Sequence, residues 1–563
     1  MSIEIDSVLS SMSLEQKAGQ VFTFQKTGSM IQPEDSKAIQ ELHCGGFRLH
    51  PWEGAAHDYC KPGDKANAMS PKKKYLGSPY LTPAQLAEQL NGMQDLAMAR
   101  SPGIPLHYAI DQEGDQSGDY TRGGVVFFPS AMGYTATGDL ELCRRCHRVV
   151  ARQLRAIGIH FIHSPVLDVN VNPDNPEIYT RSFSDDPAVV ARYAAVVLEA
   201  FESEGVCGIG KHFPGRGQSS EDAHYAIPRY SCTREQMEKI DLAPYRALIG
   251  NGLRAIMSAH TVYPGLGDSE NVATLSKVIL TAFLRGQLGF DGIVTTDSMT
   301  MRGIVDKYGV AQASAMALAA GADLVLMKSG RADQVACVET VVQWVRQGRL
   351  DESRLNDAVR RILAFKRDAG LFKTPKVDPA KADEPIHAPE NIALAVEAAE
   401  RSAMVLKNDG VLPLRPDQKI LIIEQNSFFC FKANDLHYHE GMLGEAVYRY
   451  APQTEGINTG WSMNEINLDE IRPKIDWADV IVCTNFYGRA GAMNDGVVQA
   501  LIGTGKPVVV VTSTPYQVKR HRNAAAVLLS FLNVTHGLQV SADILFGKRR
   551  AQGTWPLKHF MWE

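Results

Sequence analysis

No part of the 563-residue sequence approaches the roughly 18 consecutive apolar residues that a membrane-spanning helix needs. Residues 1–6 lack the basic-then-apolar order of a signal peptide. A large excess of either charge is missing too, because the net charge is −5, which is too small to indicate nucleic acid or an anionic membrane as a partner. We therefore expect a protein that binds neither nucleic acid nor membrane.

Cysteine is scarce and follows no disulfide pattern. The nine cysteines are an odd number spread through apolar or helical segments, so we expect reduced thiols and a cytoplasmic location. Cys143-Arg-Arg-Cys146-His147 matches the attachment signature of c-type haem, but it lies in a segment with helical periodicity and without an export signal. We interpret it as a chance match on a helix surface.

Cofactor motifs are missing as well. Residues 503–506, Gly-Thr-Gly-Lys, precede a strand-like run instead of following one, which is the wrong order for a phosphate-binding loop. A metal-dependent barrel hydrolase is one alternative, but its candidate ligands are irregularly spaced: His212, His224, His260 and Asp297. We expect no cofactor and no metal.

Length and composition indicate a globular protein of two domains. Hydrophobic residues make up 45% and charged residues 21% of the chain, which is ordinary for such proteins. A chain of 563 residues exceeds what one hydrophobic core usually serves. Residues 373–392 lose the apolar periodicity and turn to Lys, Pro, Ala, Asp and Glu, as in an interdomain linker. We predict one domain over residues 1–372 and another over 393–563.

Eight short apolar runs recur in the first domain, with helical segments or loops between them. They are mostly apolar rather than strictly alternating, as expected for parallel strands covered on both faces. The runs are residues 21–24, 45–49, 106–110, 159–169, 206–213, 255–259, 292–296 and 324–327. Eight strand–helix units predict an α/β fold, a (β/α)8 TIM barrel. A doubly wound sheet has a similar periodicity and is the alternative.

Four further runs follow the predicted linker and indicate a smaller α/β (αβα) sandwich domain. These runs are residues 419–424, 480–486, 507–513 and 525–532. Within the first domain, residues 53–80 form a long, locally basic insertion that is poor in apolar residues. Such a segment is either a lid or a disordered surface loop.

Polar side chains gather at or just after the ends of the predicted barrel strands, where barrel enzymes carry their reacting groups. They are Asp111, Arg181, Lys211, His212, His260 and Asp297. Asp111 is suited to accept hydrogen bonds from two neighbouring sugar hydroxyls, and the cations can donate to others. For each residue taken alone, a structural ion pair is the alternative.

Two acidic residues are placed for catalysis. Residues 292–297 form an apolar strand that ends on Asp297, which either caps the next helix or acts as a carboxylate nucleophile. In the loop of residues 211–224, Asp222 lies two positions before His224. A carboxylate that close can hold an imidazole in one tautomer and stabilise its charged form. The loop therefore predicts proton transfer.

These motifs make the chain similar to glycoside hydrolase family 3, in particular to its β-N-acetylglucosaminidase branch. The matching stretches run in family order: residues 111–114, 164–170, 181–183, 211–215, 222–224, 294–299 and 320–326. Beyond the predicted linker, residues 402–410 and 412–414 resemble the opening of the family's sandwich domain.

The resemblance implies a retaining glycosidase. Asp297 would attack the anomeric carbon, and His224, aligned by Asp222, would protonate the departing oxygen and then activate the acceptor. Other branches take this acid from a distant glutamate. A neutral imidazole does not repel an anionic acceptor, so phosphate is an alternative to water. The residues that the resemblance assigns to the sugar are Asp111, Arg181, Lys211, His212 and Met299.

Two departures from the family pattern concern the substrate. Arg216 replaces a histidine that is usual in relatives. Residues 115–119 replace the usual Gly-Arg and leave Arg122 as the nearest substitute for a sugar-binding arginine.

The second predicted strand also departs from the pattern, because it ends in Arg48 and His50 instead of apolar residues. Arg48 and Arg216 together could bind an anionic group on the sugar. The alternative is that Arg48 pairs with Asp115 or Glu113 and never meets the substrate.

We therefore expect an exo-acting retaining β-N-acetylhexosaminidase that binds a small carbohydrate, as a monomer or a homodimer. The alternatives are a family member for a β-glucoside or an anionic hexose, a glycoside phosphorylase, and a non-catalytic sugar sensor. Asp222, His224 and Asp297 are all present, which favours an enzyme, because a binding protein does not need all three.

Overall fold

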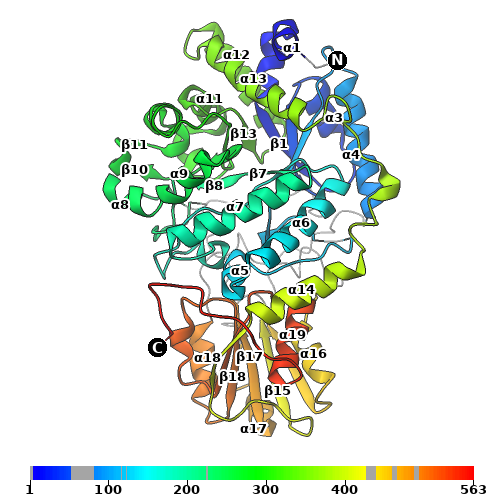
Figure 1. Ribbon diagram of the computed structural model, residues 1–563, viewed down its shortest axis with the longest axis vertical. Coiled ribbons are helices and arrows are strands. Elements are labelled where there is room, and N and C mark those ends of the chain that lie inside the picture. Colours follow the sequence, from blue (N-terminus) through cyan, green and yellow to red (C-terminus); the bar gives the residue numbers. More distant parts are fainter. Residues whose placement is uncertain are drawn as a thin grey trace.

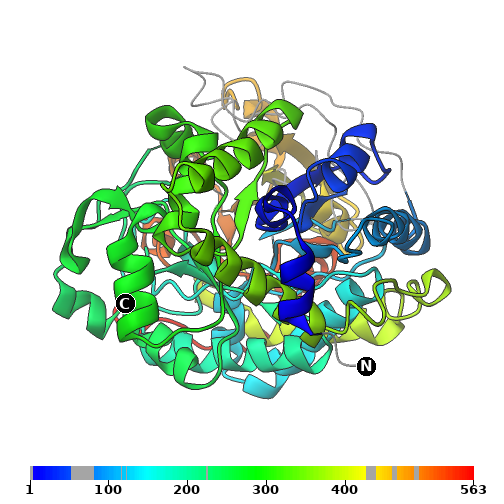
Figure 2. The ribbon, with the colours of Figure 1, turned by 90° about the horizontal axis from the view of Figure 1, so that it is seen from above.

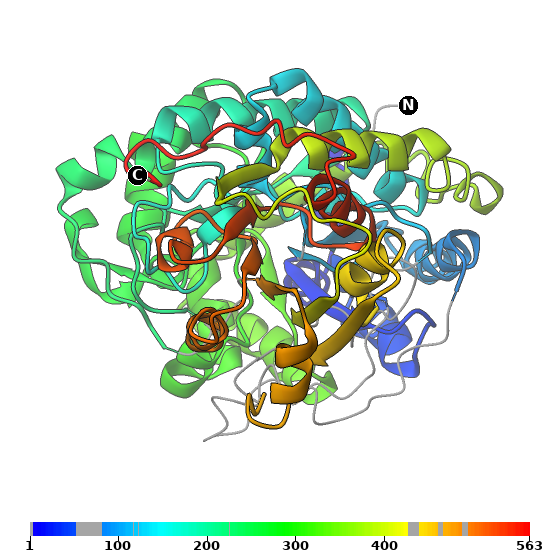
Figure 3. The same cartoon turned by 90° about the horizontal axis from the view of Figure 1, so that it is seen from below.

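The computed structural model describes residues 4–51, 81–115, 117–121, 123–223, 226–425, 439–459, 466–486 and 494–562. In Figure 1 a ring of strands and helices lies above a second, smaller sheet with its own helices. Figure 2 shows the ring from above. Figure 3 shows the second part from below, in front of the ring.

The first part is built around eight parallel strand positions. They are β1 (Phe22–Thr27), β2 (Gly46–His50), β3 (His107–Ile110), β6 (Phe161–Ile162), β7 (Cys207–Gly208) with β8 (Gly210–Phe213), β9 (Ala255–Ser258), β12 (Ile293–Thr296) and β13 (Val325–Met327). The neighbours pair in the orders β13-β1-β2-β3-β6-β7 and β12-β9-β8. Each strand thus lies beside the next one along the chain, as short β–α–β connections require.

The two runs of strands join into one ring at both seams. Between β12 and β13, Thr295 bridges Leu324, and the amide of Thr296 donates to the carbonyl of Leu324. At the other seam, β7 and β8 are one strand interrupted at Ile209, whose amide donates to the carbonyl of Ile162. The predicted barrel is therefore confirmed. The doubly wound alternative is wrong, because such a sheet has two open edges.

Helices cover the outside of the ring. Their starts follow capping rules: Asp139 and Asp186 accept hydrogen bonds from the first amides of α6 and α7. The helical segments are α1 (Ile5–Ser11), α2 (Leu14–Gln20), α3 (Pro33–Gln40), α4 (Pro83–Met98), α5 (Ala131–Thr137), α6 (Leu140–Ala156), α7 (Pro187–Ser203), α8 (Arg234–Lys239), α9 (Leu242–Gly250), η4 (Val278–Gln287), α10 (Arg302–Tyr308), α11 (Val310–Ala320), α12 (Arg331–Arg346) and α13 (Glu352–Asp368). No helix in the described ranges has the length and apolarity to cross a membrane.

The haem-like motif lies in α6, as its periodicity predicts. Cys143, Cys146 and His147 are all buried, and the ring of His147 packs against Tyr134 and Phe201. The motif thus occupies the inner face of the helix, which corrects our expectation that it lies on the surface. Burial among aromatic rings accounts for small thiols at these positions.

The second part is a six-stranded sheet in the order β14-β19-β18-β17-β15-β16, with only β14 antiparallel to its neighbour. The strands are β14 (Met404–Asn408), β15 (Ile420–Gln425), β16 (Thr454–Thr459), β17 (Val480–Asn485), β18 (Val508–Thr512) and β19 (Ala526–Leu529). The four predicted runs form the inner strands. The edge strands β14 and β16 escaped prediction because they are only partly buried and lack a continuous apolar run.

Helices pack on both faces of this sheet, which confirms the predicted sandwich. Leu421 and Ile423 pack against α17 (Arg472–Trp477) and α18 (Asp495–Ile502). Ile420 and Ile422 point the other way, toward α14 (Pro389–Ser402), α16 (Met442–Tyr448) and α19 (Thr535–Leu545), because strand side chains alternate. This second cluster is continuous with the core of the barrel, and α14 lies between the two parts in Figure 1.

The predicted linker, residues 373–392, follows the surface of the barrel. It contains η5 (Pro379–Lys381) and the first turn of α14. The Asn91 side-chain amide exchanges two hydrogen bonds with the backbone of Val377, and Nε2 of His387 lies 2.8 Å from the carbonyl oxygen of Gly123. The segment is therefore attached to the first part, and the exact domain boundaries stay a prediction. The insertion at 53–80 lies outside the described residues.

A buried carboxylate joins several elements at the amino end of β13. Asp323 has no exposed surface, and its oxygens accept hydrogen bonds from Arg285 and Arg354 at 2.6 Å and from the amide of Val294 at 2.9 Å. Arg361 lies 3.3 Å away. Because each lone pair has a donor, the cost of burying the charge is offset. This end of the barrel is opposite the predicted reaction face.

We expect Asp323→Asn to lower the free energy of unfolding by about 3–5 kcal/mol, because it leaves partly buried guanidinium groups without their buried counter-charge. Urea unfolding followed by circular dichroism measures this change. Asp291→Asn is the matched control: this carboxylate also pairs with Arg361, but its side chain is 93% exposed, so the expected change is below about 1 kcal/mol. Equal changes in the two variants would contradict the assignment.

Candidate active site

Most of the polar residues predicted at strand ends meet at one end of the barrel. The carboxyl ends of parallel strands point the same way, so the side chains that follow them can approach one another. Ion pairs join these residues to two further carboxylates in one chain of alternating charge. Its members are, in order, Arg48, Asp111, Lys211, Glu113, Arg181, Glu177, Arg216 and Asp297.

Asp297 follows β12 directly and ends this chain. Its Oδ1 accepts a hydrogen bond from the amide of Ser298 at 2.7 Å, and its Oδ2 lies 3.7 Å from Nη2 of Arg216. Met301, not Asp297, precedes α10, so the helix-capping alternative is wrong. A guanidinium so close favours the ionised carboxylate, and 14% of the side chain stays exposed. Asp297 thus has the charge and the access that a nucleophile needs.

Arg216 is buried behind Asp297. Its Nη2 donates to Oε1 of Glu177 at 2.7 Å, and its backbone amide donates to Oδ1 of Asp168 at 2.8 Å. Burial opposes its charge, but the carboxylates of Glu177 and Asp297 raise the pKa of Arg216. The guanidinium is therefore balanced by groups of the protein itself.

Arg48 points into the barrel mouth, where its Nη2 hydrogen-bonds both Asp111 and Asp119, the latter at 2.7 Å. Oδ2 of Asp119 also accepts the amide of Asp111 at 3.0 Å. The alternative partners proposed from the sequence, Asp115 and Glu113, are wrong, because both of these carboxylates bind other groups. The general form of that alternative is correct, because Arg48 does pair with carboxylates.

Asp111 is an ionised acceptor with an open edge. Its Oδ1 lies 3.1 Å from both Nζ of Lys211 and Nδ1 of His163. Burial alone would raise the pKa of Asp111, but Lys211 and Arg48 outweigh it and hold this pKa well below its usual value. One quarter of the side chain, 25%, remains exposed. These properties suit an acceptor for sugar hydroxyls.

Glu113 holds two cations, Arg181 in the segment after β6 and Lys211 within β8. Nε and Nη2 of Arg181 donate to its two oxygens at 2.8 and 3.0 Å, and Nζ of Lys211 lies 2.6 Å from Oε1. Burial works against ionisation, but Arg181 and Lys211 lower the pKa of Glu113 to about 2. Both cations are thereby fixed in position beside Asp111.

His212 is fixed by a buried carboxylate. Its Nδ1 lies 2.7 Å from Oδ2 of Asp168, and both side chains are buried. Burial raises the pKa of Asp168 to about 6, although Arg216 acts in the opposite direction. The contact holds Nδ1 of the ring in the protonated, donating form.

Two predicted residues lie deeper than expected. Met299 has no exposed surface and belongs to the hydrophobic core, so it forms no part of the wall of the site. His260 is 1% exposed, with Nδ1 2.9 Å from Oγ1 of Thr274 and Nε2 3.0 Å from the carbonyl oxygen of Ser298. It supports the backbone beside Asp297.

Only one member of the predicted acid–base pair lies within the described residues. Asp222 is half-buried in the loop after β8, whereas His224 and Arg122 lie outside the described residues. Upstream in this loop, Nε2 of Gln218 donates to Asp241 at 3.1 Å, and burial raises the pKa of Asp241 to about 7. The roles of the pair stay predictions.

The second domain reaches the loop that carries Asp111. The backbone amide of Asn533 donates to Oδ1 of Asp115 at 2.6 Å, and its side-chain amide donates to Oδ2 at 3.2 Å. Nearby, the hydroxyl of Tyr516 donates to the carbonyl oxygen of Asn170 at 2.7 Å. The loops after β3 and β6 are therefore fixed from outside the barrel.

A glutamate of the second domain is a poor candidate for the acid. Glu424 is buried, which raises its pKa to about 7, but its two oxygens accept the amides of Leu443 and Gly444 at 2.9 Å. It therefore caps α16. Of the polar cluster in this domain, His439 lies 3.6 Å from Glu445, and His437 is outside the described residues.

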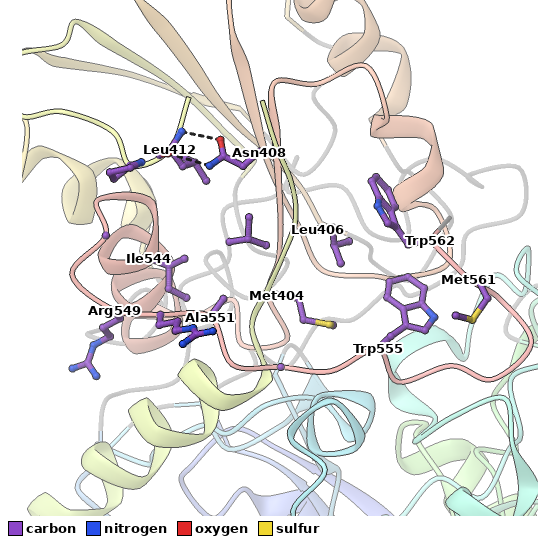
Figure 4. A pocket seen from close by; sticks show the side chains of 15 residues that line it. Met404, Leu406, Asn408, Leu412, Ile544, Arg549, Ala551, Trp555, Met561 and Trp562 are labelled. Atoms are coloured by element: carbon purple, nitrogen blue, oxygen red, sulfur yellow. Dashed lines mark hydrogen bonds between the residues drawn. The ribbon is translucent and has the colours of Figure 1, made fainter. Parts of the chain in front are cut away.

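A hollow of about 640 Å³ also opens in the second domain, between β14 and the C-terminal segment (Figure 4). Its walls include Met404, Leu406, Trp555 and Trp562. Among the described residues that line it there is no carboxylate, imidazole or thiol, so it offers no nucleophile or proton donor of the required type.

The described residues form no group of three or more His, Cys, Asp and Glu side chains that could hold a metal ion. His212 and His260 both direct ring nitrogens to protein partners.

Comparison with known proteins gives consistent matches. Residues 74–365 match the model of the glycosyl hydrolase family 3 N terminal domain. The chain is 28% identical to beta-hexosaminidase A of Pseudoalteromonas piscicida over 84% of its length and 86% of that protein. It is 30% identical to a beta-N-acetylglucosaminidase/beta-glucosidase of Cellulomonas fimi, over 59% of each. A glycoside hydrolase family 3 beta-N-acetylglucosaminidase from Paenibacillus sp. str. FPU-7 superposes with a TM-score of 0.85 at 27% identity, covering 97% of this chain and 99% of that one.

Sequence reasoning missed the carboxylates that hold the site together. Glu113, Asp168 and Glu177 all lie within or beside the motifs that point to function. The signal was therefore present, but a counter-ion is recognisable only with its partner, and Arg181 lies 68 positions from Glu113. Asp119 gave no sign of its role in the sequence pattern.

Glu113→Gln tests this arrangement through pH. The pKa of Glu113 is lowered from its usual 4.5 to about 2, so its ionised form stabilises the fold above about pH 4.5, and this contribution is lost as the pH falls toward 2. We expect the variant to unfold with a free energy about 3 kcal/mol lower near neutral pH, and the difference from wild type to shrink in acid. Urea unfolding at about pH 7, 5 and 3 measures it. A difference that is constant with pH would count against the assigned ion pairs, and Glu221→Gln, at an exposed position, is the control.

Proposed function

Because the chain belongs to glycosyl hydrolase family 3, we propose that it is an exo-acting retaining β-N-acetylhexosaminidase that removes terminal β-linked N-acetylglucosamine. The enzyme class and the sugar are supported by a beta-hexosaminidase relative that aligns over most of both chains. They are also supported by the beta-N-acetylglucosaminidase whose whole structure superposes on this one. The observation that carries the chemistry is the partly exposed carboxylate of Asp297 beside the guanidinium of Arg216.

In the first step, Oδ2 or Oδ1 of Asp297 attacks the anomeric carbon and forms a glycosyl-enzyme. Arg216 keeps the carboxylate ionised before attack, and the leaving oxygen takes a proton from His224, which Asp222 orients. In the second step, the same imidazole removes a proton from water while the water oxygen attacks the anomeric carbon. The bond between the sugar and Asp297 breaks, which releases the sugar and restores the carboxylate. One histidine can do both because its ordinary pKa lies near neutral pH.

In this proposal, the sugar lies over the series of ion-paired residues that runs from Arg48 to Asp297. Asp111 accepts from its hydroxyls through the exposed edge of the carboxylate. Lys211, Arg181 and His212 act beside it, held by Glu113 and Asp168. Because the charges of these residues are already paired, they bind a neutral sugar through directed hydrogen bonds.

A β-glucoside is the second candidate substrate. The relative from Cellulomonas fimi carries both activities in its name and is 30% identical to this chain over the aligned region. The proposed acid–base histidine leaves phosphate as an acceptor in place of water. Arg48 and Arg216 do not favour an anionic sugar by themselves, since each is paired with two carboxylates.

Location and assembly complete the proposal. Seven cysteines, all those in the described ranges, are free thiols, which supports a reducing compartment such as the cytoplasm. The partner is a small carbohydrate, and the enzyme acts as a monomer or a homodimer. The catalytic domain extends to about residue 372 and the sandwich domain begins at about residue 393.

Asp297 is tested by covalent labelling. A 5-fluoro glycosyl fluoride of N-acetylglucosamine keeps the 2-acetamido group and slows the second step, so the glycosyl-enzyme accumulates. We expect peptide mass spectrometry to find the sugar on Asp297, and Asp297→Ala to lower kcat by at least about 10⁴-fold. A label on another side chain would refute the mechanism.

His224 is tested by its dependence on the leaving group. His224→Ala is expected to lower kcat/KM by about 10²–10⁴-fold on a substrate with an alkyl leaving group. The loss is smaller on a nitrophenyl glycoside, because nitrophenolate departs with little protonation. Glu221→Ala, three positions away and exposed, is the control and should be near wild type. Full activity of the histidine variant on the alkyl glycoside would end the proposal.

The substrate is tested by a panel of nitrophenyl β-glycosides, each with and without inorganic phosphate. We expect the highest kcat/KM on the N-acetylglucosaminide, with the glucoside second. Turnover of neither sugar would refute the proposed function, and a sugar 1-phosphate among the products would identify a phosphorylase.

A further inference from the structure

Lys328 is the first residue after β13 and lies at the same end of the barrel as the site. The register of β13 and β1 pairs Met327 with Phe24, so the next row places Lys328 beside Gln25. Gln25 is in turn paired with Arg48 on β2. Residues paired in this way send their side chains to the same side of a sheet. The row thus carries Lys328, Gln25 and Arg48 side by side.

This side is the inside of the barrel. Arg48 points into the mouth, where it hydrogen-bonds Asp111. Lys26, one position further along β1, points outward and pairs with Asp35 on α3 at 3.0 Å. Because side chains alternate along a strand, the row that contains Lys328 faces inward.

Lys328 differs from the other cations at this end of the barrel. Arg48, Lys211 and Arg216 each have carboxylate partners. Within the described ranges, by contrast, the half-buried ammonium of Lys328 has no hydrogen bond or ion pair with the protein. An ammonium that lies at the barrel mouth without a carboxylate partner can donate its hydrogen bonds to an anionic group of a ligand.

The charged groups around Lys328 follow or belong to three strands of the barrel, β2, β3 and β12. Burial lowers the pKa of Lys328 to about 8, Arg48 acts in the same direction, and the carboxylates of Asp111, Asp119 and Asp297 act against them. The ammonium is therefore charged at neutral pH, but in the described part of the chain none of these carboxylates is bonded to it directly. An anion beside it would supply the missing counter-charge.

We propose that Lys328 is the anion-binding residue of the site, whose ammonium receives a carboxylate, sulfonate or phosphate group of a ligand at the barrel mouth. The inference rests on the proposed glycosidase function and adds a substrate class to it. The anion has two sources: a substituent on the sugar itself, or inorganic phosphate that replaces water as the acceptor. Arg48 cannot take this role in the same way, because two carboxylates already hold it.

Binding measurements test the proposal without turnover. Calorimetry on the full-length protein compares glucuronate, glucose and inorganic phosphate. Lys328→Met removes the charge and keeps the chain length, and it is expected to weaken glucuronate or phosphate binding at least about 10-fold while glucose changes less than about 2-fold. Lys307→Met is the matched control, because Lys307 is an exposed lysine on α10, the helix that follows β12. Equal effects on glucose and on both anions, or none, would overturn the inference.

The pH dependence separates a charge from a structural role. Glucuronate keeps a constant charge above neutral pH, so its dissociation constant should rise as the pH passes about 8, where the wild-type ammonium loses its proton. Lys328→Arg should retain binding and move this rise beyond the measured range, because guanidinium stays protonated. A wild-type rise that persists unchanged in the arginine variant would also overturn the inference.

Kinetics then identify the source of the anion. Selective loss of nitrophenyl β-glucuronide cleavage in Lys328→Met assigns the site to the sugar, and selective loss of acceleration by phosphate assigns it to the acceptor. Failure of the proposed function has a different signature: the wild type binds anions through Lys328 but cleaves no nitrophenyl β-glycoside.

Discussion

Mutual compensation of buried charges holds the reaction face together. Arg181, Lys211 and Arg216 are taken out of water, which is unfavourable unless a carboxylate meets each of them. The carboxylates come from other strand ends, so only the closed barrel can assemble the pairs. Although burial acts the other way, the neighbouring cations hold the pKa values of Asp111 and Glu113 below their usual range, and Arg216 lies 3.7 Å from the last member, Asp297. The same ion pairs therefore stabilise this end of the barrel and determine its distribution of charge.

The second domain belongs to the site in a structural sense. Asn533 holds the loop that contains Glu113 and follows Asp111, and Tyr516 holds the loop after β6. The hydrophobic cluster on one face of its sheet is continuous with the core of the barrel. Without the second domain, the buried carboxylate of Asp115 would lose the two hydrogen bonds from Asn533. The two domains therefore depend on each other although Asp297 belongs to the barrel alone.

Several features were readable from the sequence because they depend on short-range pattern. The eight barrel strands appear as apolar runs at nearly their true positions, and Asp297 ends one of them. Features that depend on distant partners were not readable. The sequence suggested Asp115 or Glu113 as the partner of Arg48, but the loop after β3 turns Asp119 toward it instead. Met299 follows Asp297 by two positions, yet the chain turns it into the core.

The sequence by itself determined the fold class, the family and the identity of the carboxylate at the end of β12, because apolar periodicity and compact motifs are properties of neighbouring residues. Only the tertiary structure decided which cations are neutralised. The sequence left open whether Arg48 is paired or binds an anion together with Arg216. Both arginines are paired, whereas Lys328 was not singled out and has no partner in the described part of the chain. The physical reason is that electrostatic pairing depends on distance in space, which closure of the barrel sets and position along the chain does not.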